Sequence, residues 1–189
     1  MKSIENIINR NSSKKLEKPY PNKKEMELIY KAALRAPDHA MLRPTRFIEI
    51  TGKGLDRLSK TFNKYAKENI SELDPKKLEK YTNAPYRAPM IIVLVTEFQN
   101  HPKVPEIEQM LSTAAAAQNI LLAVDSLGYG AIWRTGIFAL DKNISRYFDL
   151  NEKQKILGYI YIGTRIGEKK KISHVDINKF VSCWNNDSK

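Results

Sequence analysis

The chain has 189 residues, a formal net charge of +11 and a single cysteine, Cys183. This length suits one hydrophobic core, so we expect a single domain over residues 1–189, and one cysteine excludes an internal disulfide and favours a reducing cytoplasm. No run approaches the ~18 apolar residues of a membrane-spanning helix, and the N-terminus lacks the apolar stretch of a signal peptide.

The positive charge comes mostly from lysines spread along the whole chain. They form short doublets and one triplet, Lys169-Lys170-Lys171, without interleaved aromatic residues, a zinc-binding pattern or an RNA-binding motif. Solvated surfaces explain this distribution better than a nucleic-acid interface does. We therefore expect no nucleic-acid partner and no membrane partner, while attraction of small anions stays open.

The N-terminal segment predicts a short helix and then a polar loop with several cations. Ile4, Ile7 and Ile8 recur at helical spacing after Ser3, which can cap the helix. Residues 10–15 combine arginine and lysines with hydroxyl and amide donors, which suits an oxyanion. Taken alone, however, the stretch fits an ordinary polar loop better.

The next segment predicts a helix, a turn and a strand. Asn22 and Glu25 have the spacing of a capping box, and Pro37 forces the turn after the helix. His39 follows, before a strand at residues 47–50. This histidine can be structural, a metal ligand or a hydrogen-bond donor to a ligand. No other His, Cys or carboxylate lies at ligand spacing, so we expect no metal.

The middle of the chain predicts a lysine-rich cover and a buried core. Amphipathic helices are expected at residues 55–66 and 75–81. The apolar run 90–96 is typical of a central strand covered on both faces. Residues 110–124 carry no charge and are apolar nearly all round, which predicts a helix enclosed by protein on every side and ended by Gly128.

A short strand-like run with an unexpected cation follows this helix. It spans residues 129–136, and Arg134 interrupts its apolar context. Such an arginine can extend its stem to the surface, pair with a buried carboxylate or serve a ligand. The composition of this run does not decide among these roles.

The C-terminal part predicts two more helices, a strand and a tail. The helices are expected at residues 144–148 and from Asn151, and the strand at residues 156–163. The tail, residues 164–189, contains an isolated apolar patch at residues 180–184 that is too small for a core of its own. We expect it to pack on another surface, such as a partner subunit.

Seven short motifs occur in order along almost the whole chain: Asn9-Arg10-x-Ser12, Arg35-Ala36-Pro37-Asp38-His39, Pro44, Asn83-Ala84-Pro85-Tyr86-Arg87-Ala88-Pro89, Lys103-Val104-Pro105, Ile132-Trp133-Arg134-Thr135-Gly136 and Tyr161-Ile162-Gly163-Thr164. The ordered set resembles the small FMN-dependent NAD(P)H nitroreductases, specifically their short single-domain branch. The resemblance implies an α+β fold, a three-layer α/β/α sandwich with a central mixed sheet. It also implies a homodimer with one FMN at each end of a large interface.

The resemblance further implies a cofactor site. Lys14 would lie by the flavin N1 and C2 carbonyl and stabilise the reduced ring, and no residue would act as a covalent nucleophile. Residues 123–128 match a segment that is associated with the nicotinamide in this branch. The other implied contacts are Arg10, Asn11 and Ser12 to the FMN phosphate and ribityl chain, Arg35 and His39 to the cofactor, and Trp133, Arg134 and Thr135 to complete the pocket.

The implied reaction passes a hydride from NADH or NADPH to flavin N5 and then to a nitroaromatic, quinone or similar acceptor. Two departures from the family pattern affect this expectation. Asn11 stands where the branch often has a second arginine, and Met41–Thr45 replaces a common Asn-x-Gln-Pro-Trp. Arg43 could substitute for the lost amide contacts or select an anionic acceptor. The alternative function is an FMN-binding storage or sensor protein with little turnover.

Overall fold

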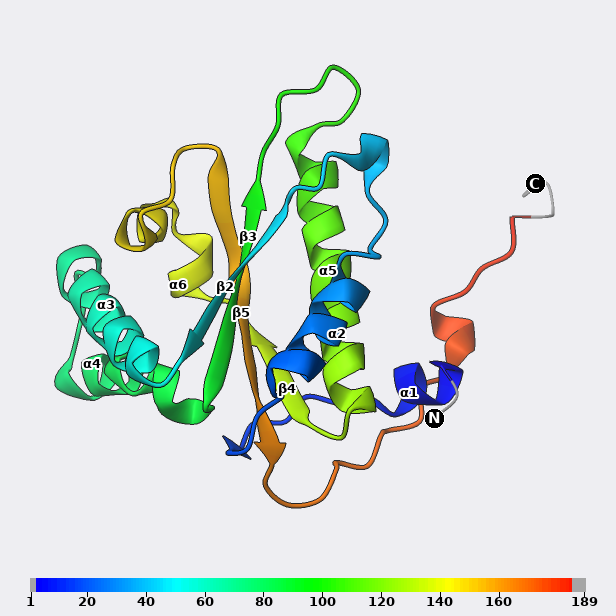
Figure 1. Ribbon diagram of the computed structural model, residues 1–189, viewed down its shortest axis with the longest axis horizontal. Helices are drawn as coiled ribbons and strands as arrows, with labels where there is room; N and C mark the ends of the chain where they lie inside the picture. Colours follow the sequence, from blue (N-terminus) through cyan, green and yellow to red (C-terminus); the bar gives the residue numbers. More distant parts are fainter. Residues whose placement is uncertain (1–2, 185–189) are drawn as a thin grey trace.

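The computed structural model describes residues 3–184 and is built around one sheet (Figure 1). The strand β5, Gln154–Arg165, pairs with β3, Met90–Glu97, which pairs in turn with β2, Thr45–Thr51. β5 also pairs with β4, Gly130–Arg134, and its last residues pair with β1, Leu16–Glu17. All these pairings are antiparallel, so the expected mixed sheet is wrong for the described part of the chain.

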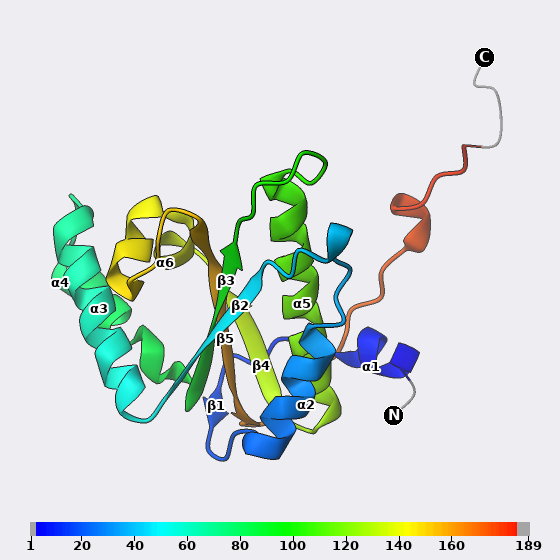
Figure 2. The same ribbon diagram turned by 45° about the horizontal axis from the view of Figure 1, so that its top comes forward.

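Helices cover both faces of the sheet, which explains why the apolar pattern could not reveal the strand directions. A continuous apolar run indicates only that both faces of a strand are covered, which is frequent in parallel sheets. Here helices cover both faces of an antiparallel sheet, and the same pattern results (Figures 1 and 2). The α-helices are α1 Ser3–Asn9, α2 Lys23–Ala33, α3 Lys53–Asn69, α4 Pro75–Thr82, α5 Glu106–Ser126 and α6 Ile137–Leu140, and the 3₁₀ helices are η1 His39–Met41, η2 Ala84–Arg87, η3 Lys142–Phe148 and η4 Ile177–Lys179.

The core has two halves, one on each face of the sheet. Successive side chains of β3 point to opposite faces. Ile91 and Val93 pack against the α3 and α6 side, whereas Ile92 and Leu94 pack against the α2 and α5 side. All four are fully buried, and burying each such side chain stabilises the fold by about 1.5–3 kcal/mol. The prediction of a central strand covered on both faces is confirmed.

Local signals set the ends of the helices next to the site. The capping box of α2 is present, because Asn22 Oδ1 accepts from the Glu25 backbone N–H at 3.1 Å and Glu25 Oε2 accepts from the Asn22 N–H at 2.7 Å. α5 ends at Ser126, and Gly128 has φ +87°, which a glycine adopts without strain. Both sequence predictions are confirmed.

The helix α5 is not enclosed on every side within one chain. One face packs against the sheet and α2, but a stripe on the opposite face is open. Ile107 is 57 % exposed and Leu111 is 61 % exposed, and Gln118 continues the stripe at helical spacing. The uncharged stretch 110–124 within α5 therefore indicates a face that needs a further cover, which the described part of a single copy does not provide.

Two predictions for the C-terminal part need correction. Asn151 begins a turn and not a helix, because its side-chain oxygen accepts from the Lys153 backbone N–H at 2.9 Å and the chain enters β5 directly. β5 also continues two residues beyond Gly163. The described tail runs past α1 with Phe180 77 % exposed, and residues 185–189 of the predicted tail lie outside the described residues (Figure 1).

Candidate functional site

A cation-rich pocket of about 220 Å³ lies between the loop after α1 and the end of β5. We call it the Ser13 pocket. Arg165 Nε donates to Ser13 Oγ at 2.9 Å, and Asn11 Nδ2 donates to the Lys170 carbonyl at 2.9 Å. These bonds tie the loop to β5 and to the start of the tail. The lining residues are Asn11, Ser12, Ser13, Lys14, Lys15, Arg165, Ile166, Glu168 and Lys170.

The loop that forms this pocket also contacts the beginning of β4. The Ser13 backbone N–H donates to the Ala131 carbonyl at 2.9 Å. Gly130 permits this approach, because a Cβ at its position would lie 3.0 Å from Ser13 Oγ. Arg10, half-buried, immediately precedes the loop. Of the donors predicted at residues 10–14, Asn11, Ser12 and Lys14 line the pocket at this end of β4, and Arg10 does not.

A second pocket, of about 290 Å³, lies at the other end of β4 on the α3 and α6 side of the sheet. We call it the Arg134 pocket. Two predicted site residues, Arg134 and Thr135, line it together with two further cations and several aromatic rings. The complete lining is Phe62, Lys80, Tyr81, Ala84, Arg87, Arg134, Thr135, Gly136, Ile137, Phe138, Tyr159 and Tyr161.

Arg134 is held against an aromatic wall of its pocket. Its Cζ lies 5.4 Å from the centroid of the Tyr161 ring, which is a cation–π distance. Burial, and next the positive charge of Arg87, lower the pKa of the Arg134 guanidinium. Its Nε is buried without a hydrogen-bond partner among the described residues. Of the roles left open by the sequence, pairing with a buried carboxylate is thus not found in this part of the chain.

The neighbouring Trp133 points to the opposite face of the sheet and fixes the end of β4. Its indole packs with the α2 and α5 half of the core and lies against Gly158 of β5. A Cβ on Gly158 would lie 2.1 Å from Trp133 Nε1. The glycine is therefore required for the tryptophan to close over the strand, at the place where the pairing of β5 with β3 shifts register.

The two pockets are separated by the length of β4. Gly130, beside the Ser13 pocket, and Arg134 are four residue steps apart, which corresponds to about 13 Å along a strand. An elongated ligand with an anionic group at one end could therefore lie along this edge of the sheet. The structure places Lys14 in the Ser13 pocket and not among the residues that line the Arg134 pocket.

His39 is not brought to these pockets within one chain, and Arg35 lines neither of them. His39 Nδ1 lies 2.6 Å from Glu108 Oε2, in the first turn of α5. The loop of the Ser13 pocket begins near the other end of that helix, where Asn6 Nδ2 donates to the Leu122 carbonyl at 3.0 Å. The fourteen residue steps from Glu108 to Leu122 span about 21 Å along a helix. The predicted site residues thus form two groups.

Sequence reasoning did not single out two arginines that line these pockets. Arg165 follows the last apolar residues of β5, in the segment where the tail was expected to begin. Arg87 stands within the Pro85 to Pro89 segment, whose prolines drew attention to a bend and not to its charge. A cation directly beside a buried strand is the signal in the sequence that points to such residues, as it does for Arg134.

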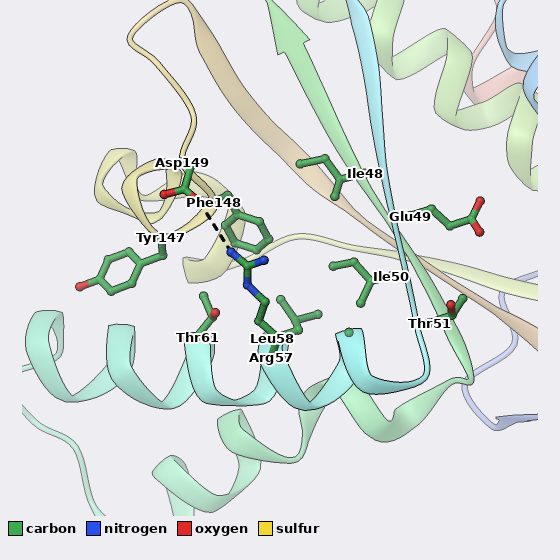
Figure 3. Close-up of a pocket in the computed structure, with 11 residues that line it drawn as sticks. Ile48, Glu49, Ile50, Thr51, Arg57, Leu58, Thr61, Tyr147, Phe148 and Asp149 are labelled. Atoms are coloured by element: carbon green, nitrogen blue, oxygen red, sulfur yellow. Dashed lines mark ion pairs between the residues drawn. The ribbon is translucent and has the colours of Figure 1, made fainter.

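A further pocket, of about 390 Å³, lies between the open edge of β2, α3 and η3 (Figure 3). Arg57 and Asp149 face each other across it, with their nearest charged atoms 3.6 Å apart. None of the predicted site residues lines this pocket. It lies along the edge of the sheet that is remote from β4, so we do not include it in the candidate site.

Two kinds of feature are not found in residues 3–184. None of the helices there is long and apolar enough to cross a membrane. Nor do three or more His, Cys, Asp or Glu side chains come together there in a way that could hold a metal ion.

Comparison with known proteins identifies the family. The profile described as "Nitroreductase family" matches residues 7–164. "Putative NAD(P)H nitroreductase YdjA" of Escherichia coli strain K12 is 36 % identical over 185 residues, which cover 97 % of this chain and 100 % of YdjA. The chain therefore belongs to the Nitroreductase family.

Two solved structures show the same fold. A nitroreductase-like family protein of Bacillus cereus superposes with a TM-score of 0.83 at 18 % identity, over 98 % of this chain and 97 % of its own. A nitroreductase of Bacteroides fragilis, whose crystal structure contains bound FMN, gives a TM-score of 0.74 at 20 % identity, over 97 % and 99 %. At these identities the likeness concerns the fold alone.

Proposed function

We propose that the chain is an FMN-dependent oxidoreductase that takes a hydride from NADH or NADPH and passes it to a nitroaromatic, quinone or similar small acceptor. The observation that supports this most is the pair of cation-lined pockets at the two ends of β4. FMN has a phosphate at one end and a planar ring at the other. It therefore matches a site with cations and hydrogen-bond donors at one end and aromatic walls at the other. Membership of the Nitroreductase family and the FMN in the Bacteroides fragilis structure agree with this assignment.

The Ser13 pocket would hold the phosphate. Arg10, Asn11, Ser12 and Lys14 would supply donors, and Arg165, which is bonded to Ser13 and Asp125, would hold the loop in place. Charge-assisted hydrogen bonds of this kind are about twice as strong as neutral ones. The additional lysines around this pocket offset the loss of a second arginine at position 11.

The Arg134 pocket would receive the pyrimidine side of the ring. The residues fit a group of this kind, because the buried Arg134 Nε lacks a partner among the described residues and the pocket walls are aromatic. Arg134 and Thr135 would contact the ring, and Trp133, on the opposite face of the sheet, would hold the end of β4 in position. The flavin supplies hydride acceptance and donation at N5, so the protein needs to provide binding, orientation and charge stabilisation, without a covalent nucleophile.

A complete site would require a second copy of the chain. His39 lies roughly a helix length away from the Ser13 pocket, so it would reach the cofactor of the partner and not that of its own chain. Arg35 would contact the cofactor from the same connection after α2. The open stripe on α5 and the exposed apolar residues of α1 and the tail offer surface for this contact. We therefore propose a homodimer with shared sites, in which the tail, residues 164–189, packs on the partner subunit. We also propose that it acts in the cytoplasm.

Steady-state kinetics would test the proposed activity. Consumption of NADH and NADPH is followed at 340 nm with a quinone, a nitroaromatic or no acceptor, in protein reconstituted with FMN. The proposal predicts turnover that depends on the acceptor and on bound FMN. Tight FMN binding with no turnover for any of these acceptors would instead support the storage or sensor function, which the altered Met41–Thr45 segment favours.

A further inference from the structure

The Arg134 pocket contains an excess of positive charge that the described chain does not balance. Three cations line it, namely Lys80, Arg87 and Arg134, and none of its lining residues is an aspartate or a glutamate. Neither arginine forms an ion pair within residues 3–184. A partly buried cation is normally paired, because removing its charge from water is costly.

The aromatic wall does not supply the missing negative charge. Burial raises the pKa of Tyr161 to about 12, so its phenol is neutral at physiological pH. The ring offers Arg134 only a cation–π contact at 5.4 Å. Burial, and next the positive charge of Arg87, lower the pKa of Arg134, so a second cation beside it makes its charge less favourable.

Arg165, another partly buried arginine of the candidate site, shows what a balanced cation looks like in this fold. Arg165 Nη2 lies 3.1 Å from the buried carboxylate of Asp125, and Arg165 Nε donates to Ser13 Oγ at 2.9 Å. These contacts within the chain balance the charge of Arg165. Arg87 and Arg134 have no such ion pair within residues 3–184, so the structure favours an anionic group that enters from outside.

Arg87 is better placed than Lys80 to act on such a group. It is half-buried at the end of η2, between the buried residues Pro85 and Ala88, so its backbone is fixed by the core. Lys80 is exposed on α4, and its ammonium remains in water. A cation in a low-dielectric surrounding interacts more strongly with a nearby charge than an exposed one does.

We infer that Arg87, together with Arg134, is the residue pair that stabilises the negative charge on the pyrimidine side of the reduced flavin. This inference rests on the proposed function and replaces Lys14, which lines the Ser13 pocket, in that role. Arg87 is then a charge-stabilising residue that tunes the reduction potential of the cofactor.

The charge balance of the reaction defines what the arginines would do. A hydride from the nicotinamide brings two electrons and one proton to flavin N5, and the nicotinamide leaves as a cation. The ring thereby gains one negative charge, shared between N1 and the C2 oxygen. When the hydride passes on to a quinone, the ring becomes neutral again and solvent supplies the second proton of the hydroquinone. Arg87 and Arg134 thus favour the state between the two transfers.

The two-electron midpoint potential of bound FMN tests this inference most directly. We expect Arg87→Gln to reduce the preference of the site for reduced over oxidised FMN about tenfold, which lowers the potential by about 30 mV. Sulfite, which adds to flavin N5 and leaves the same negative charge on the ring, should bind about tenfold more weakly. Arg87→Lys keeps the charge and should recover most of both values.

Two matched variants make the outcome specific. Arg57→Gln removes an arginine that is 80 % exposed on α3, outside both pockets of the candidate site, and should leave the potential unchanged. Lys14→Gln tests the other candidate cation. Wild-type potential and sulfite affinity in folded, FMN-loaded Arg87→Gln, or a shift in Lys14→Gln alone, would overturn the inference. A wild-type protein that binds no FMN would instead overturn the proposed function itself.

Discussion

Arg165 Nε donates to Ser13 Oγ at 2.9 Å and joins two residues that are 152 positions apart in the chain. The same guanidinium contacts the buried carboxylate of Asp125 and the Tyr129 carbonyl. The loop after α1, the end of α5 and the end of β5 therefore meet at one side chain. This contact gives the phosphate end of the proposed cofactor site a fixed shape before any ligand arrives.

Replacing this arginine should affect stability as well as binding. Arg165→Ala leaves Asp125, whose side chain is 4 % exposed, with Lys169 as its remaining cation. We expect the free energy of unfolding in urea to fall by about 2 kcal/mol. Lys171→Ala removes an exposed lysine of the tail and should change it by less than about 0.5 kcal/mol. Equal effects of the two substitutions would show that the Asp125 contact is not needed.

The assignment of the phosphate site predicts a selective loss of cofactor affinity. Arg10→Ala removes a half-buried guanidinium beside the Ser13 pocket and should weaken FMN binding at least ~10-fold, because charged hydrogen bonds to phosphate are lost. Fluorescence titration with FMN measures this. Riboflavin, which lacks the phosphate, should bind both proteins with similar affinity. A loss of equal size for riboflavin would argue against a phosphate contact at Arg10.

The close contact between Trp133 and Gly158 predicts that Gly158 cannot be replaced by alanine without a large loss of stability. Gly158→Ala would place a Cβ 2.1 Å from the indole nitrogen, at a backbone φ of +153°, and should destabilise the protein by about 3 kcal/mol. Gly128→Ala has a positive φ but no atom within 4 Å of the new Cβ, so it should cost only about 1 kcal/mol of backbone strain. Thermal unfolding of both variants separates the clash from the strain, and similar losses would contradict the contact.

The division of the predicted site into two groups predicts complementation between subunits. Arg10→Ala and His39→Ala homodimers should each bind FMN poorly at both sites. A mixed dimer contains one site with both residues and one with neither, so it should bind about one FMN tightly. Differently tagged chains allow the mixed dimer to be purified and its flavin counted. No recovery in the mixed dimer would place both residues in the site of one chain.

The open stripe of α5 predicts which surface joins the subunits. Leu111 is 61 % exposed at its centre, and Leu111→Arg should convert the dimer to a monomer by leaving a charge unpaired in an apolar interface. Leu140 of α6 is 70 % exposed on the opposite side of the sheet, so Leu140→Arg is the matched control. Sedimentation velocity distinguishes the two states. A dimeric Leu111→Arg protein would exclude this face as the interface.

The sequence predicted most of the elements because local signals fix them. The apolar run of β3, the capping box at Asn22 and the glycine after α5 each act within a few residues, and the structure confirms them. The strand directions were not predictable in this way, since burial on both faces has the same signature in parallel and antiparallel sheets. The turn at Asn151 was mistaken for a helix because an Asx turn and a helix start share the same residue types.

The candidate site was predictable in part and for a different reason. The donors at residues 10–14 and 133–135 were found by the resemblance to a family, and the structure places them at the two ends of β4. The contributions of Arg87 and Arg165 depend on contacts between distant segments, which no local pattern encodes. The same holds for the separation of His39 from the Ser13 pocket, because it follows from the length of α5.

The visible absorption spectrum of the purified protein, before and after anaerobic addition of NADH and NADPH, tests the central claim most directly. A flavin oxidoreductase should show an absorption band near ~450 nm that bleaches with a nicotinamide, since reduction removes the absorption of the oxidised ring. A band that persists with both nicotinamides would contradict turnover and support storage. A colourless protein that also fails to take up added FMN would contradict the proposed function altogether.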